Sequence, residues 1–201
     1  MFLSSFNSFA SAKHPPLIVC LQDPAVWRNR LPFFAGFDSF APLISNRRPR
    51  VAFYVFRSLM DMATVTPIFT SRSDLATLEI SAHSLFGTKA DKFLIVNCYS
   101  VWGLTATART VSPVLALPSF TSPTLVVGDF NIHHPSADPA RTHSSSELKA
   151  SFPYFSRAAE LGYSLLNTPG VYTRFPLQGS SRPSVVDLAF ASSTLMPFFQ
   201  E

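Results

Sequence analysis

Short apolar runs, many of them rich in β-branched and aromatic residues, recur along the chain and predict strands. Prolines and small polar residues separate the runs, and Ser71–Ser73 predicts a hairpin turn between two of them. The predicted strands are residues 17–21, 37–42, 51–56, 63–70, 74–81, 93–99, 125–127, 163–167, 172–175 and 184–192. Such a series of strands with few helices between them predicts an α/β or α+β domain.

Helical signals are fewer. Apolar residues at helical spacing in residues 1–14 predict a helical tail, residues 1–16, ahead of a single domain over residues 17–201. A transit peptide is the alternative for this tail, which lacks acidic residues but also lacks arginine. Residues 105–120 predict a crossover helix. Another helix is expected from Pro153 to Leu161 with Ser151 as its cap, although Ser144 and Glu147 also stand at capping-box spacing.

Composition excludes several classes of protein. With 201 residues, 47% hydrophobic and 14% charged, the chain can build one substantial core and does not have the composition of a disordered protein. The uninterrupted apolar runs are too short to span a membrane. A net charge of +4 is compatible with a polyanionic partner. Cys20 and Cys98 lie in apolar runs without zinc-site spacing, which predicts buried free thiols.

The segment Thr124–His134, TLVVGDFNIHH, carries the most distinctive chemistry. If the chain stays extended after the apolar run, Asp129, Asn131 and His133 face one side and Phe130 and Ile132 face the core. Gly128 allows a tight turn or a close approach of the backbone. A carboxylate and an amide at a strand end suit phosphate chemistry beside a hard cation. The residues alone leave an Asx turn open as the alternative.

Three motifs together carry a resemblance to a known family. GDFNIHHP, with LQDP upstream and SVVDLAFAS downstream, resembles the endonuclease/exonuclease/phosphatase superfamily, especially the apurinic-type endonuclease domain of LINE-type (non-LTR) retrotransposons. The resemblance extends over residues 17–192. It implies a four-layer α/β/β/α sandwich of two mixed sheets and hydrolysis of nucleic-acid phosphodiesters with Mg²⁺, or alternatively Mn²⁺. It also implies a monomer that acts on DNA in the nucleus without a membrane.

The resemblance also assigns roles to individual residues. Asp129 and Asn131 would position the attacking water and the phosphate, and Tyr99 would bind the phosphate. Asp187 would orient a catalytic histidine. Asp23 would bind the metal, although the family pattern has glutamate there; the shorter side chain needs a local shift or a bridging water to reach the ion.

A second group of residues would contact nucleic acid. The resemblance places phosphate or nucleic-acid contacts at Asn97, His133, His134, Thr173 and Arg174. The arginines at 47, 48 and 50 form a basic cluster that suits phosphate backbone, and a solvated loop is the alternative for any one of them.

Two parts of the family pattern are not found in the sequence. The pattern has a first strand with an active-site asparagine and a late Ser-Asp-His motif, and both are missing here. We therefore expect a domain shortened at both ends, with weak or no activity. The alternatives are an inactive remnant that still binds nucleic acid, or a phosphatase or phosphodiesterase of the same fold.

Overall fold

The computed structural model describes residues 18–28, 30–44, 47–81, 92–100, 122–175 and 182–199. The predicted N-terminal helix and the predicted crossover helix at 105–120 lie outside these residues. The chain divides into two compact units, Met1–Asn97 and Cys98–Glu201.

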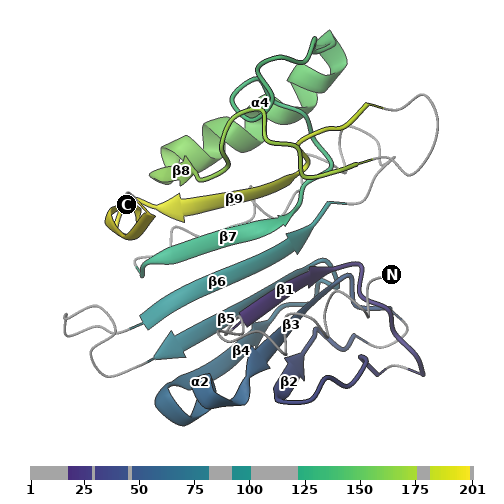
Figure 1. Cartoon of the computed structure of the whole chain (residues 1–201), viewed down its shortest axis with the longest axis vertical. Coiled ribbons are helices and arrows are strands. Elements are labelled where there is room, and N and C mark those ends of the chain that lie inside the picture. Colours follow the sequence, from purple (N-terminus) through teal and green to yellow (C-terminus); the bar gives the residue numbers. More distant parts are fainter. Residues whose placement is uncertain are drawn as a thin grey trace. The chain divides into compact units, whose positions relative to one another are not determined.

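A three-stranded antiparallel sheet forms part of the first unit. It contains β1 (Ile18–Gln22), β2 (Phe37–Phe40) and β3 (Val51–Phe56) in the order β1-β3-β2 (Figure 1). The central strand β3 is buried from residue 51 to 55 because it is paired on both edges and covered by neighbouring side chains. Phe34, Phe37 and Tyr54 form an aromatic cluster beside it, in which the rings of Phe34 and Tyr54 meet edge to face.

The second set of strands in this unit contains β4 (Thr64–Phe69), β5 (Leu75–Ser81) and β6 (Lys92–Tyr99), neighbours in that order. The predicted hairpin is confirmed, since β4 and β5 pair antiparallel on either side of residues 71–73. Pro67 lies within β4, which is tolerated because β4 is an edge strand and proline cannot donate to a ladder. The short helix α2 (Arg57–Met62), which the sequence did not predict, follows β3 directly.

The second unit contains an antiparallel sheet covered by a helix. Its strands are β7 (Thr124–Asp129), β8 (Tyr163–Leu165) and β9 (Asp187–Ser192), in the order β7-β9-β8. Helix α4 (Ser145–Glu160) packs against this sheet, and the short 3₁₀ helix η1 (Met196–Phe199) follows β9 (Figure 1). The rings of Tyr154 and Phe155 on the helix contact those of Phe130 and Phe190, so aromatic side chains hold helix and sheet together.

Two local predictions in this unit are wrong. Helix α4 starts at Ser145, about two turns before Pro153, because Ser144 and Glu147 form a complete capping box. Ser151, the expected cap, is fully buried inside the helix. Residues 172–175 form no strand; they make only an isolated bridge between Arg174 and Ser184.

Cys20 and Cys98 are free thiols, as predicted; Cys98 is buried, as predicted, whereas Cys20 is only half-buried. Among the described helices, none has the length and apolar character needed to cross a bilayer.

Candidate functional site

Two carboxylates face each other at the end of the second unit's sheet. Strand β7 ends at Asp129, strand β9 begins at Asp187, and the strand register makes these two residues direct partners. Both side chains are half-buried. Burial and the nearby charge of Asp187 raise the pKa of Asp129 to about 6, and burial raises the pKa of Asp187. The sheet therefore brings together two acids that were predicted from separate motifs.

Asn131 is held over Asp129 by a local turn. Its backbone N–H donates to Oδ1 of Asp129 at 3.0 Å, and its side-chain amide donates to the carbonyl of Ser100 at 2.8 Å. Asn131 has a positive φ of 48°, so the extended chain that was expected to point Asp129, Asn131 and His133 to one side is not formed. Phe130 and Ile132 are buried as predicted. The Asx turn and the candidate site are thus the same structure.

The segment before β9 supports Asp187. The hydroxyl oxygen of Thr173 accepts hydrogen bonds from the backbone N–H groups of Val186 at 3.1 Å and Asp187 at 3.0 Å. The positive charge of Arg174 acts against burial and lowers the pKa of both Asp129 and Asp187, which places this guanidinium within electrostatic reach of the pair. Both Thr173 and Arg174 are exposed, so they lie at the surface beside the two acids.

Asn167 was not singled out from the sequence, yet it fixes the same strand from the other side. Its side-chain amide donates to the carbonyl of Asp187 at 3.0 Å, and its side-chain oxygen accepts from the N–H of Ala189 at 2.8 Å. Strand β8 has ended at Leu165, so this side chain continues the ladder in place of a backbone. The available signal was a polar residue closing the apolar run YSLLN.

Tyr99 and Gly128 lie where the end of β6 approaches β7. The N–H of Ser100, next to Tyr99, donates to the backbone oxygen of Asp129 at 2.7 Å. A side chain at Gly128 would have its Cβ 2.0 Å from the carbonyl oxygen of Cys98. The glycine therefore allows a close approach between two backbones. Tyr99 is half-buried at this position, on the strand that borders Asp129.

The loop after Asn131 buries its two predicted histidines. His133 and His134 are only 7% and 8% exposed, and burial lowers the pKa of both, which keeps the rings neutral at pH 7. The ring of His134 stacks on Phe155 with 3.6 Å between centroids. Neutral, buried rings carry no positive charge to offer a phosphate.

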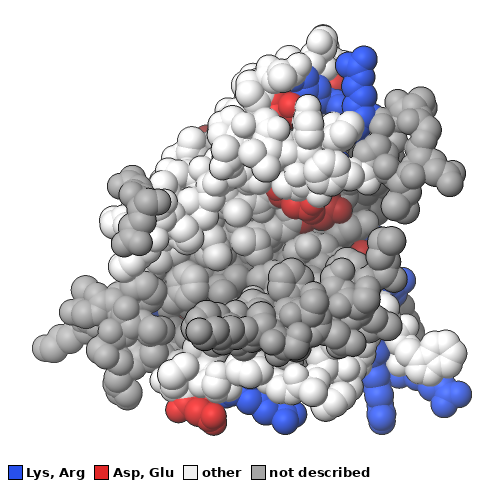
Figure 2. Space-filling model, viewed as in Figure 1, with Lys and Arg blue, Asp and Glu red and all other residues white. Residues whose placement is uncertain are grey.

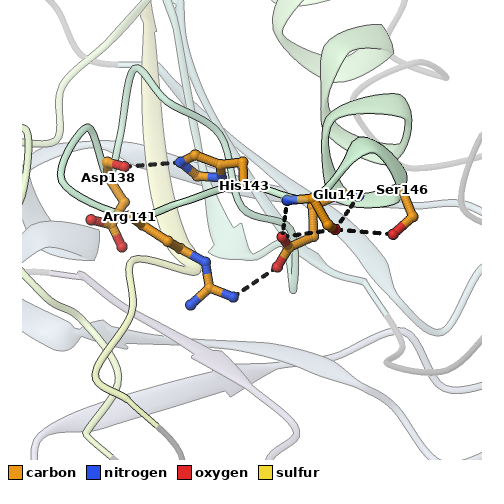
Figure 3. Close-up of polar contacts among 6 residues, drawn as sticks. Asp138, Arg141, His143, Ser146 and Glu147 are labelled. Atoms are coloured by element: carbon orange, nitrogen blue, oxygen red, sulfur yellow. Dashed lines mark hydrogen bonds and ion pairs between the residues drawn. The ribbon is translucent and has the colours of Figure 1, made fainter.

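Polar contacts connect the end of this loop, residues 138–143, to the start of helix α4. Nε2 of His143 lies 3.0 Å from the backbone oxygen of Asp138, and Arg141 is paired with Glu147 at 2.7 Å (Figure 3). Glu147 also belongs to the capping box of α4. Burial opposes its ionisation, but its hydrogen bonds to Ser144 and Arg141 outweigh burial and lower its pKa to about 2. These contacts give the loop a defined structure.

In the first unit, the predicted metal ligand lies between two arginines. Oδ1 of Asp23 is 3.4 Å from Arg48 and 3.3 Å from Arg50. Asp23 has a positive φ of 48°, and its N–H donates to the backbone oxygen of Arg50 at 2.7 Å. The carboxylate is 45% exposed and thus accessible from solvent.

Asn97, predicted to contact phosphate, lies in the interior of the first unit. Its amide donates to the backbone oxygens of Leu21 at 3.0 Å and Ala52 at 2.9 Å, and its side-chain oxygen accepts from Gln22 at 2.7 Å. The side chain is fully buried and links β6 to β1 and β3. Both of its donors are used, which gives Asn97 a structural role between the two sets of strands.

Replacing Asn97 with alanine should therefore destabilise the protein by about 2–4 kcal/mol, because two buried carbonyl oxygens lose their donors. Gln22→Ala removes one bond of the same cluster at a half-buried position and should cost about 1 kcal/mol. Urea denaturation followed by tryptophan fluorescence measures both. Equal losses in the two variants would contradict a buried role for Asn97.

The donor chemistry of the second unit fits a divalent cation. Asp129 and Asp187 are two opposed carboxylates whose pKa values are raised, so a cation beside them would relieve burial and repulsion together. Within the described residues, no group of three or more His, Cys, Asp or Glu side chains is arranged to hold a metal. One or two carboxylates with several retained waters is the usual protein environment of Mg²⁺, in contrast to zinc.

Solved structures resemble this chain over nearly its whole length. The endonuclease domain of TRAS1, a telomere-specific non-LTR retrotransposon, matches with a TM-score of 0.67 and 16% identity, over 96% of this chain and 80% of that domain. The APE2 catalytic domain of Xenopus laevis matches with a TM-score of 0.62 and 11% identity, over 98% and 79%. The human Nocturnin catalytic domain with bound sulfate matches with a TM-score of 0.54 and 13% identity, over 96% and 73%. These likenesses confirm the predicted α/β sandwich.

Sequence comparison gives the family. No curated protein matches this sequence significantly. The profile described as the Endonuclease/Exonuclease/phosphatase family, however, matches residues 12–200, which include every candidate site residue named above. The chain belongs to the endonuclease/exonuclease/phosphatase family.

Proposed function

We propose that this protein hydrolyses phosphodiester bonds of nucleic acid, as a retroelement-type endonuclease that uses Mg²⁺, with Mn²⁺ as an alternative. The observation that carries the proposal is the direct pairing of Asp129 with Asp187, with Asn131 fixed over the first of them. Family membership supports a phosphoester substrate. The fold likeness to the TRAS1 endonuclease domain, which comes from a non-LTR retrotransposon, favours nucleic acid.

Asp129 suits the role of general base. A carboxyl group with a pKa of about 6 is ionised at neutral pH, yet it is basic enough to accept a proton from an attacking water. Asn131 restricts this carboxylate through the Asx turn, so the acceptor oxygen keeps one orientation. Arg174, exposed beside the pair, would bind a phosphate oxygen, and Tyr99 would donate its hydroxyl to another.

When bound, a divalent cation would offset the negative charge that develops on the transferring phosphoryl group. Asp187, the strand partner of Asp129, would supply an oxygen donor for it. Asp23 remains a predicted metal ligand. Thr173 would hold the backbone of Asp187 in place during turnover through its two hydrogen bonds.

Nicking of supercoiled plasmid by the purified chain tests the proposal. We expect slow conversion to open circles in Mg²⁺, because two parts of the family pattern are missing, and no conversion in EDTA. Nucleic-acid binding without nicking in either metal would favour the inactive remnant. Turnover of a phosphomonoester in place of plasmid would favour a phosphatase of the same fold. Either result would reject the nuclease proposal.

Asp23→Asn tests the predicted metal ligand. If Asp23 holds Mg²⁺, the Mg²⁺ concentration for half-maximal nicking should rise about tenfold or more, since even outer-shell changes weaken metal sites by about 10–100-fold. Asp38→Asn is the matched control, because Asp38 is also a half-exposed acid paired with an arginine in the first unit. An unchanged Mg²⁺ dependence in Asp23→Asn would leave Asp23 with only its arginine contacts.

Arg174→Gln should move the pH dependence of hydrolysis. Arg174 lowers the pKa of Asp129, so its removal raises that pKa, and the acid limb of kcat/KM shifts to higher pH. KM should also rise, because a phosphate contact is lost. Arg157→Gln on helix α4 serves as the control, since Arg157 pairs with Glu160. An acid limb that stays in place would argue against Asp129 as the group that titrates.

A further inference from the structure

Residues 24–28 and 30–33, which follow β1 in the first unit, present large aromatic side chains to solvent; we call them the Trp27 loop. Trp27 is 76% exposed and Phe33 is 78% exposed. Burial of large aromatic side chains is strongly favourable, because it removes much apolar surface from water. A pair of them exposed in one short segment therefore indicates an interaction surface. Neither aromatic residue is part of the candidate site at Asp129 and Asp187.

The Trp27 loop has a defined shape. Trp27 and Arg30 exchange two backbone hydrogen bonds, at 3.0 and 2.9 Å, which bring the two residues together in an antiparallel bridge. Arg28, which follows Trp27, has a positive φ of 47°, a backbone conformation typical of tight turns. The turn fixes the backbone from which the Trp27 ring projects.

Core contacts anchor the other end of the loop. The hydroxyl of Tyr54 donates to the backbone oxygen of Pro32 at 2.8 Å, and Phe34 packs edge to face on the Tyr54 ring. At the start of the loop, Arg48 donates to the backbone oxygen of Pro24 at 2.6 Å. A loop held at both ends loses little conformational entropy when it binds a partner.

The part of the chain that contains the Trp27 loop is rich in positive charge. The segment from Gln22 to Arg50 contains five arginines and two aspartates, a net charge of +3 out of +4 for the whole chain. Among the described residues, Arg28, Arg30 and Arg47 form no ion pair with an acid, and the Arg28 guanidinium lies 5.8 Å from the centre of the Trp27 ring. Figure 2 shows blue side chains projecting at the lower right, where Figure 1 draws the loops that flank β1, β2 and β3.

The loop also borders a hollow. Seven of its residues, from Ala25 to Pro32, line a space of about 780 Å³. Trp27, Arg28 and Arg30 are among these lining residues. The hollow is large enough to admit planar groups beside the exposed rings.

We propose that the Trp27 loop binds single-stranded nucleic acid, with unpaired bases stacked on Trp27 and Phe33 and phosphates held by Arg28, Arg30 and Arg47. This inference rests on the proposed nucleic-acid substrate. Exposed aromatic rings interleaved with arginines are the usual arrangement for binding strands without base pairing. A duplex keeps its bases stacked on one another, so only the arginines would engage it, and the two rings would contribute nothing.

Fluorescence anisotropy with a labelled oligo-dT strand tests the proposal. The full chain carries Asp129→Asn so that no strand is cut. Trp27→Ala and Phe33→Ala should each weaken binding of the single strand about 5- to 150-fold, the range for one stacked base. Binding of a duplex of equal length should change less than about twofold. Phe199→Ala, an aromatic that is 49% exposed in the other unit, is the matched control and should leave both affinities unchanged.

Arginine variants separate charge from stacking. Arg28→Gln and Arg30→Gln should each reduce the slope of log Kd against log salt by about 0.7, the value for one phosphate contact on a single strand. Trp27→Ala should leave that slope unchanged. The proposal is overturned if oligo-dT does not bind, if Trp27→Ala binds it as tightly as the parent, or if both aromatic variants lose duplex and single-strand binding equally.

Failure of the proposed hydrolysis would look different. Hydrolysis of bis(p-nitrophenyl) phosphate by the chain with native Asp129 reports chemistry without a polymer. Loss of that hydrolysis with intact, Trp27-dependent strand binding rejects the nuclease and keeps the stacking site. Intact hydrolysis together with strand binding that does not depend on Trp27 keeps the nuclease proposal and rejects the stacking site.

Discussion

Asp129→Asn should reduce nicking of plasmid DNA by about 10²–10⁴-fold, the usual contribution of a general base. The amide has nearly the same shape as the carboxylate, so the turn with Asn131 keeps its backbone. What is lost is the group whose pKa of about 6 allows proton transfer near neutrality. Plasmid nicking in Mg²⁺ and hydrolysis of bis(p-nitrophenyl) phosphate should fall together, because the loss is chemical.

Asp129→Asn should lower activity but should not lower the stability of the folded protein. A carboxyl group whose pKa rises from 3.8 to about 6 on folding contributes stability below about pH 4 that is lost as pH rises through about 6. At about pH 8 the native protein carries an ionised, half-buried acid opposite Asp187, whereas the amide introduced by Asp129→Asn is neutral. We therefore expect the variant to melt at the same or a higher temperature at about pH 8, with the difference shrinking as pH falls below about 6 and disappearing below about pH 4.

Asp61→Asn, at an exposed position of helix α2, is the matched control and should affect neither property. Activity retained in Asp129→Asn would remove Asp129 from the reaction. A lower melting temperature together with lost activity would show instead that the substitution damages the fold.

Gly128→Ala should have the largest effect on stability, at least about 3 kcal/mol, with loss of activity. The new Cβ would lie 2.0 Å from the carbonyl oxygen of Cys98 and 2.8 Å from its sulfur. The nearer atom belongs to the backbone, so a rotamer change cannot relieve the clash. Strand β7 would have to move away from the end of β6, and Asp129 is the next residue along β7.

Gly162→Ala provides the comparison. Nothing lies within 4 Å of a Cβ at Gly162, but its φ of 74° favours glycine, so the expected loss is only about 1–2 kcal/mol. Urea denaturation of both variants distinguishes a steric clash from backbone strain. Similar losses in the two would mean that the contact with Cys98 is not rigid.

Local patterns predicted most of the strands and the chemistry at their ends. The alternating and apolar runs were sufficient for β3, β5, β6 and β7, because period and β-branching act within one segment. The motifs also identified Asp129 and Asp187 as polar residues in or after apolar strands. Their direct pairing depends on the register between β7 and β9, which joins segments far apart in the sequence.

What the sequence did not predict was decided by competing local geometry or by tertiary contacts. The start of α4 was misplaced because Pro153 was given more weight than the capping box at Ser144 and Glu147. Asn131 leaves the extended conformation because its N–H bonds to Asp129. Asn97 looked like a phosphate contact, since nothing local shows that β1 and β3 would place two backbone carbonyls against it.

One side chain also covers an open strand edge in the second unit. Backbone pairing with the outer edge of β9 ends where Leu166 donates to Ala189, and the amide of Asn167 then occupies the N–H of Ala189 and the carbonyl of Asp187. Unpaired groups of this kind are where a foreign strand would add to a sheet and begin aggregation. A hydrophobic residue in place of Asn167 would leave the N–H of Ala189 and the carbonyl of Asp187 open to intermolecular pairing, so the amide protects this part of the strand that carries Asp187.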